Sequence, residues 1–174
     1  MREALTPDRL RTFMRELARD AKEPCRIYIA GGASALLCGW RGSTLDVDIK
    51  IVPDSSRIFA AIPRVKEQMN INVELASPAD FVPALRGWEA RSSFIEQVGP
   101  VSFHHFDFYT QCLAKLERNH AMDREDVASM VRDGLVVPKR LLVLYNEAED
   151  ELRERYPAIH PPALRARVEA FALQ

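Results

Sequence analysis

The chain has 174 residues, of which 47% are hydrophobic and 28% are charged, a composition typical of a globular protein with a sizeable core. Its formal net charge of −1 creates no overall field for a polyanion, so any nucleic-acid contact needs a local basic patch. Three widely spaced cysteines argue against a disulfide framework. With no bilayer-length apolar stretch and no secretory leader, we expect a soluble, cytoplasmic protein without a membrane partner.

The first part of the chain alternates helices and strands. Thr6 and Pro7 predict the start of a helix, after which a buried strand is expected over residues 26–30. Gly31-Gly32 breaks that strand, and a short helix over residues 33–39 follows. The later elements are strands over 44–52, 70–75 and 101–108 and a helix over 55–68 that is interrupted near Pro63. The alternation places Leu45, Val47, Ile49 and Ile51 on one apolar face, and Ile71, Val73 and Leu75 on another.

After Tyr109 the pattern becomes helical, with helices expected over residues 110–119, 124–132, 138–156 and 162–173. The fold class is therefore α/β (α+β), with a small sheet and a C-terminal helical part. We predict an α/β core over residues 1–108 and a helical region over residues 109–174.

Two carboxylates lie side by side on one predicted strand. Asp46 and Asp48 are at positions i and i+2, which project from the same face of a strand. Because adjacent carboxylates repel each other, a cation normally compensates them. That cation is either a metal ion or a basic side chain, such as Lys50 on the same face or Arg41 upstream.

A glycine turn precedes this strand. Gly31 and Gly32 allow the backbone to approach a phosphate closely, and Ser34 lies at the start of the following helix. The alternative is that the two glycines only make a tight turn, because the pattern matches neither a dinucleotide-binding nor a P-loop fingerprint. Together with the two aspartates, the turn predicts a site for a metal–triphosphate complex.

Residues 28–51, YIAGGASALLCGWRGSTLDVDIKI, resemble the signature of the DNA polymerase β-like nucleotidyltransferases. Among them the chain is most similar to small bacterial members related to the abortive-infection type nucleotidyltransferase toxins. The likeness covers roughly residues 26 to 145. It implies a small mixed sheet of the nucleotidyltransferase type, a third carboxylate on a later strand, and a helical K-L-x-R segment followed by D-x-x-D.

The resemblance implies further site residues in this sequence. The third acid falls on Glu74, although the family more often uses Asp there; Asp80 is the competitor, but it is well explained as a helix-capping acid. The helical motifs fall on Lys115 and Arg118 and on Asp123 and Asp126. Their alternative explanation is a solvated helix face followed by a helix cap.

The mechanism implied is transfer of a nucleoside monophosphate from a nucleoside triphosphate. Asp46, Asp48 and Glu74 would hold two Mg²⁺ (or Mn²⁺) ions about 3.5–4 Å apart. Gly31, Gly32 and Ser34 would hold the β- and γ-phosphates, and Lys115 would offset charge in the transition state. Arg118, Asp123 and Asp126 complete the predicted nucleotide site.

The sequence leaves the acceptor open among an RNA 3′ end, a protein hydroxyl and a small molecule. The resemblance to toxins implies an antitoxin as partner. Two other functions compete with the enzyme: a catalytically inactive nucleotidyltransferase fold used as a binding or regulatory module, and a structural domain in which Lys50 neutralises Asp46 and Asp48.

Overall fold

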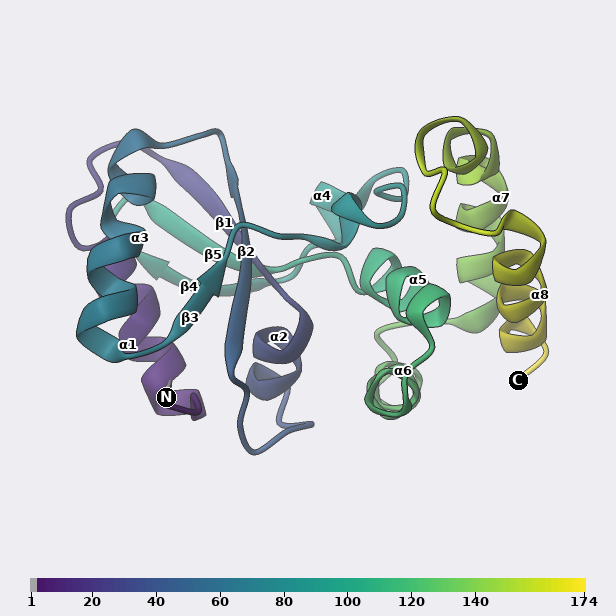
Figure 1. Cartoon of the computed structure of the whole chain (residues 1–174), viewed down its shortest axis with the longest axis horizontal. Helices are drawn as coiled ribbons and strands as arrows, with labels where there is room; N and C mark the ends of the chain where they lie inside the picture. Colours follow the sequence, from purple (N-terminus) through teal and green to yellow (C-terminus); the bar gives the residue numbers. More distant parts are fainter. Residues whose placement is uncertain (1–2) are drawn as a thin grey trace. The chain divides into compact units, whose positions relative to one another are not determined.

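The computed structural model describes residues 3–174, which fall into two compact units. The first unit comprises Met1–Ser77 and Ser92–Phe106, and the second comprises Pro78–Arg91 and Asp107–Gln174. The predicted α/β class, with a mixed sheet and a helical C-terminal part, is confirmed (Figure 1). Within the described residues, no helix is both long enough and apolar enough to cross a bilayer.

The first unit is a five-stranded mixed sheet with helices. Its elements are α1 (Pro7–Ala18), β1 (Cys25–Ala30), α2 (Gly31–Leu37), β2 (Asp46–Val52), α3 (Ser56–Met69), β3 (Asn72–Glu74), β4 (Phe94–Val98) and β5 (Val101–His105). The strand order is β3-β2-β1-β5-β4. The β2–β3 and β1–β5 pairs are parallel, whereas β1–β2 and β4–β5 are antiparallel.

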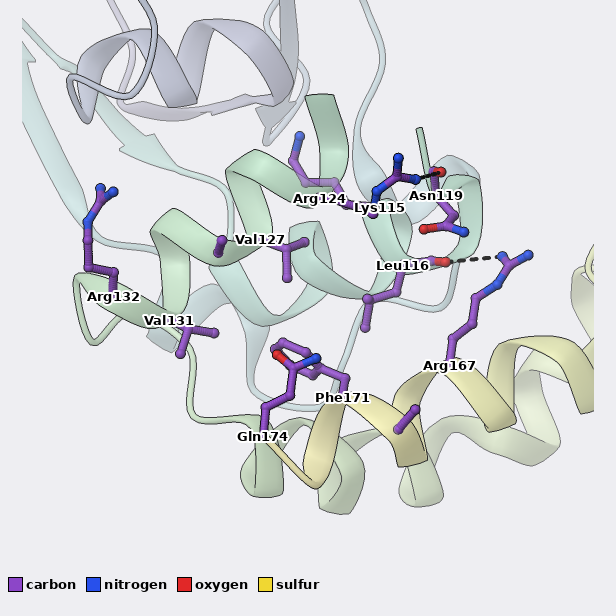
Figure 2. Close-up of a pocket in the computed structure, with 12 residues that line it drawn as sticks. Lys115, Leu116, Asn119, Arg124, Val127, Val131, Arg132, Arg167, Phe171 and Gln174 are labelled. Atoms are coloured by element: carbon purple, nitrogen blue, oxygen red, sulfur yellow. Dashed lines mark hydrogen bonds between the residues drawn. The ribbon is translucent and has the colours of Figure 1, made fainter. Parts of the chain in front are cut away.

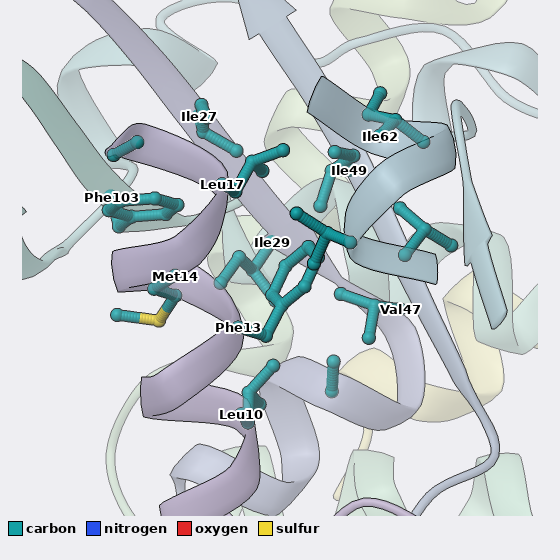
Figure 3. Close-up of a cluster of buried hydrophobic side chains, with 14 of the residues drawn as sticks. Leu10, Phe13, Met14, Leu17, Ile27, Ile29, Val47, Ile49, Ile62 and Phe103 are labelled. Carbon is teal, nitrogen blue, oxygen red and sulfur yellow. The ribbon is translucent and has the colours of Figure 1, made fainter. Parts of the chain in front are cut away.

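The core of this unit lies on one face of the sheet. Figure 3 shows Phe13 and neighbouring residues of α1, with Ile62 of α3, over the strand residues Ile29, Val47 and Ile49. Phe13 is fully buried, and the burial of β2 alternates along the strand. The residues between the core positions of β2, including both aspartates, therefore project from the opposite face of the sheet.

Three local predictions are wrong. Leu45 and Leu75 are each 59% exposed, because β2 begins only at Asp46 and β3 ends at Glu74. The helix α3 runs through Pro63 without a break, since its buried face, which includes Ile58 and Val65, holds both halves against the core.

The second unit is helical. Its elements are a short 3₁₀ helix η1 (Pro78–Asp80), α4 (Trp88–Arg91), α5 (Phe108–Arg118), α6 (Ala121–Arg132), α7 (Pro138–Arg155) and α8 (Pro161–Ala172). The sequence pattern predicted neither α4 nor β4.

The start of α5 explains why β5 is shorter than predicted. The fully buried Asp107 carboxylate accepts hydrogen bonds from the backbone N–H groups of Tyr109 and Thr110 at 3.3 and 3.2 Å. Arg91 donates two further bonds to it, at 3.0 and 2.7 Å. This N-cap begins the helix at Phe108, a residue that the sequence pattern assigned to the strand.

Two valines test the core assignment. Val101 is fully buried, whereas Val143 on α7 is 57% exposed. We expect Val101→Ala to lower the free energy of unfolding by about 2 kcal/mol, because two buried methyl groups and their contacts are lost. Val143→Ala should change it by no more than about 0.5 kcal/mol. Chemical denaturation measures both, and equal effects would contradict the assignment.

Candidate functional site

The polar face of β2 and β3 carries the predicted acids. In the parallel β2–β3 pair, Asp46 stands opposite Asn72 and Asp48 stands opposite Glu74. Residues opposite each other in paired strands project to the same face, so these four side chains lie together, away from the core. Asp46 and Glu74 are exposed, and Asp48 is half-buried.

Asn72 joins two of these carboxylates. Its Nδ2 group donates to Asp46 Oδ1 at 2.9 Å and to Glu74 Oε1 at 3.0 Å. Alternation placed Asn72 on the polar strand face, but only the strand register reveals that it stands opposite Asp46. Residues 3–174 contain no cluster of three or more acids, histidines or cysteines at metal-binding spacing. A metal site formed by Asp46, Asp48 and Glu74 therefore stays a prediction.

The glycine turn lies directly against Asp48. The antiparallel β1–β2 register places Ala30 opposite Asp48, and the chain turns into α2 at the next residue. Gly31 has a φ of +60°, and a Cβ on it would lie 2.5 Å from Asp48 Oδ2. A Cβ on Gly32 would lie 2.5 Å from Thr44 Oγ1. Only glycine allows this close approach of the turn to the carboxylate and the hydroxyl.

Gly31 and Gly39 distinguish the effect of the close approach to Asp48 on stability from the effect of backbone strain. Gly39 also has a left-handed φ, +77°, but a Cβ on it would meet nothing within 4 Å. Gly39→Ala should therefore cost only the strain of that conformation, about 1–2 kcal/mol. Gly31→Ala should cost more in chemical denaturation, because it also displaces the Asp48 carboxylate. Equal losses of unfolding free energy in Gly31→Ala and Gly39→Ala would show that the approach to Asp48 places no constraint on the turn.

Ser34 lies behind the turn. Its side chain is fully buried, and its Oγ is 2.8 Å from His105 Nδ1. Burial and, to a smaller extent, the charge of the nearby His104 lower the pKa of His105 to about 4, so the imidazole is neutral near pH 7. The hydroxyl thus tethers α2 to β5. Its predicted contact with phosphate stays a prediction, and the sequence pattern assigned no role to His105.

This tether predicts a pH dependence. An unfolded histidine has a pKa of about 6.5, so between roughly pH 6.5 and 4 the unfolded chain binds the proton that the folded chain excludes. The contribution of His105 to stability is thus complete above this window and is lost as the pH falls through it. His105→Asn should flatten the fall in unfolding free energy over that range. An unchanged profile in the variant would rule out His105 as its source.

The second unit brings together the four residues of the helical motifs. Lys115 Nζ lies 2.6 Å from Asp126 Oδ2 and 3.5 Å from Asp123 Oδ1. Arg118 donates to both oxygens of Asp123, at 2.8 and 2.6 Å. Lys115 is only 5% exposed, so the solvated helix face considered above is wrong for it, whereas the side chain of Arg118 is 57% exposed.

Asp123 also begins α6. Its Oδ2 accepts the backbone N–H of His120 at 3.2 Å in a capping box. Burial alone would raise the pKa of this carboxyl, but the hydrogen bonds from Arg118 and the charge of Lys115 together lower it to about 2. Asp123 is therefore ionised throughout the physiological range and holds the turn between α5 and α6.

The Lys115–Asp126 ion pair predicts a pattern of mutational effects. Lys115→Met leaves the buried Asp126 carboxylate without its closest cation and should destabilise the unit by about 3–5 kcal/mol. Adding Asp126→Leu should recover most of that loss, because the buried charge is then removed as well. Thermal and chemical unfolding measure both variants. A double variant as unstable as Lys115→Met would contradict a paired role.

A pocket of about 540 Å³ lies between α5, α6 and α8 in the second unit (Figure 2). Apolar residues that include Val131 and Phe171 line it, together with several arginines. Two of these arginines bind the end of α5: Arg167 donates to the carbonyl of Leu116 at 3.1 Å, and Arg124 donates to that of Asn119 at 2.9 Å. Cations at a helix C-terminus stabilise its exposed carbonyls, so these arginines secure the helix that carries Lys115.

A protein family described as "Nucleotidyltransferase of unknown function (DUF6036)" matches residues 8–155. The chain belongs to this family. Neither the curated proteins nor the solved structures provided a significant match.

The DUF6036 match includes both polar clusters, that of Asp46 and Asp48 in the first unit and that of Lys115 and its partners in the second. It ends before α8. Membership supports a general nucleotidyltransferase activity and hence a transferase.

Proposed function

We propose that the chain is a metal-dependent nucleotidyltransferase that transfers a nucleoside monophosphate from a nucleoside triphosphate to a hydroxyl acceptor. The observation that carries this proposal is the contact of the Gly31 turn with the Asp48 carboxylate, 2.5 Å from the position of a Gly31 Cβ. A backbone that can approach phosphates thus adjoins the strand that presents two acids. DUF6036 membership supports the reaction class.

The donor set fits a hard divalent cation. Mg²⁺ and Mn²⁺ prefer carboxylate oxygens, and Asp46 and Asp48 present them on one strand face with Glu74 on the neighbouring strand. These residues would hold the ion, Glu74 as the third ligand. A bound divalent ion lowers the pKa of an attacking hydroxyl and stabilises the charge on the leaving pyrophosphate.

The residues of the chain provide binding and orientation. The backbone N–H groups of Gly31 and Gly32 are the proposed ligands of the β- and γ-phosphates, at a turn that lacks Cβ atoms and lies against Asp48 and Thr44. Ser34 fixes α2 through His105 and remains the proposed hydroxyl donor to phosphate. Lys115 remains the proposed charge-compensating residue.

The remaining proposed nucleotide-site residues are Arg118, Asp123 and Asp126, which lie with Lys115 in the second unit. Their proposed part in the reaction is to hold that lysine in place. The evidence for it is the set of ion pairs that joins all four residues, of which Lys115, Asp123 and Asp126 are buried.

The biological proposal rests on the resemblance to abortive-infection type toxins. It implies a cytoplasmic, bacterial toxin-type transferase with an RNA 3′ end, a protein hydroxyl or a small molecule as acceptor, and with an antitoxin partner. Growth arrest on expression, relieved by co-expression of the adjacent gene, supports this role. Unaffected growth with active protein contradicts it.

One observation favours a second candidate function. The burial of the Lys115 ammonium group between Asp126 and Asp123 favours a nucleotidyltransferase fold used as a binding or regulatory module, because the lysine expected to act on the phosphates is already paired. Among residues 3–174 Lys50 forms no ion pair, which counts against Lys50, but not against Arg41, as the cation that neutralises Asp46 and Asp48 in the purely structural alternative. Metal-dependent nucleotide binding distinguishes the enzyme from the module.

Two substitutions test the enzyme. Purified protein with Mg²⁺ or Mn²⁺ and a labelled nucleoside triphosphate should label an acceptor from a bacterial lysate and release pyrophosphate. Asp46→Ala should abolish transfer, because a metal ligand is lost. Asp48→Asn should abolish transfer as well while leaving the fold intact, since it keeps the shape of the side chain.

Denaturation curves provide the control for both variants. If Asp48→Asn unfolds the domain, the carboxylate is structural and the proposal is wrong. If none of the four nucleoside triphosphates binds or reacts with either metal, the binding-module function replaces the enzyme.

A further inference from the structure

We propose that Arg41 is the side chain that binds the triphosphate of the nucleotide in the first unit. The inference rests on the proposed function and adds to it a residue for which the sequence offered only neutralisation of the aspartates. Four observations carry it: the position of the guanidinium, the fixation of its loop, the occupation of Lys115 elsewhere, and the position of Lys50.

The guanidinium lies beside the glycine turn. A Cβ on Gly32 would be 3.4 Å from Arg41 Nη1, and a Cβ on Gly31 would be 2.5 Å from Asp48 Oδ2. Of these two consecutive glycines, Gly32 therefore lies beside a guanidinium group and Gly31 lies beside a carboxylate. If the aspartates hold the metal ion of a metal–triphosphate complex, the guanidinium of Arg41 is the positive side chain next to the phosphates.

The loop that carries Arg41 is anchored on both sides. Thr44 exchanges two backbone hydrogen bonds with Leu5, at 2.7 and 3.2 Å, and Leu5 is fully buried. On the other side, the backbone N–H of Trp40 donates to the Ala35 carbonyl at 3.0 Å. Because both neighbours are fixed, a ligand that binds Arg41 need not order the loop, which lowers the entropic cost of binding.

Lys115 is engaged elsewhere. Its ammonium group is buried in the second unit between Asp126 and Asp123, so its positive charge is already matched by carboxylates. Arg41 belongs to the same unit as Asp46 and Asp48.

Lys50 is the competing cation in the first unit. It shares the polar face of β2 but stands opposite Tyr28, whereas Asp48 stands opposite Ala30 at the glycine turn. One strand repeat, about 7 Å, thus separates it from the turn side of Asp48. Arginine also presents a planar fork of donors that matches two phosphate oxygens, which a lysine does not.

Binding of metal–nucleotide complexes tests the assignment. The probes are the four nucleoside triphosphates with Mn²⁺, the corresponding monophosphates, and inorganic tripolyphosphate as a competitor. Arg41→Ala should weaken triphosphate binding about ten- to a hundred-fold, the loss expected for charge-assisted hydrogen bonds, and leave monophosphate binding unchanged. Arg41→Lys should restore part of the affinity. Arg57→Ala, an exposed arginine of α3, is the matched control and should bind like the wild type.

Each other outcome has a defined meaning. The assignment is overturned if Arg41→Ala binds triphosphate as tightly as the wild type, or if it loses monophosphate and triphosphate affinity equally. It is also overturned if Lys50→Met weakens triphosphate binding more than Arg41→Ala does. In each of these cases the proposed function stands. If the wild type binds no metal–triphosphate complex, the proposed function fails and the assignment with it. Should Arg41→Ala not fold, Arg41→Gln replaces it with the same expected loss and the same contrary outcome.

Discussion

The antiparallel register that places Ala30 opposite Asp48 is the constraint on which the candidate site depends. β1 ends at Ala30, so the turn that follows must pass beside the carboxylate of the neighbouring strand. A slip of one residue would move both aspartates to the core face, where Val47 now packs. The buried face of the sheet therefore fixes the acids on the other face, and the glycines are required because the turn has no room for a Cβ.

The two units compensate their acids in different ways. In the second unit, Asp123 and Asp126 are buried and paired with cations, an arrangement that holds α5 and α6 together. In the first unit, Asp46 and Glu74 share a neutral amide donor from Asn72 and are open to solvent. A divalent cation gains more from carboxylates that retain their net charge, and we therefore propose the metal site in the first unit.

The sequence predicted the parts of the fold that depend on periodicity. Alternation in β2 gives the shared face of Asp46 and Asp48, and the glycine pair marks the turn into α2. Alternation cannot give strand partners, so the position of Asn72 opposite Asp46 needed the structure. Local pattern also misses contacts between distant segments, such as the pairing of Arg91 with Asp107. The burial of Lys115 likewise follows from the packing of α5 on α6.

Binding of Mn²⁺ observed by NMR tests the central claim most directly, because a paramagnetic ion broadens the resonances of nearby nuclei. With a nucleoside triphosphate present, we predict selective broadening of the amide signals of Gly31, Gly32, Asp46 and Asp48 at substoichiometric Mn²⁺. The Asp46→Ala variant should lose this effect. Broadening centred on Asp123, or none at all at saturating nucleotide, would contradict the assignment of the acid pair on β2 as the metal site.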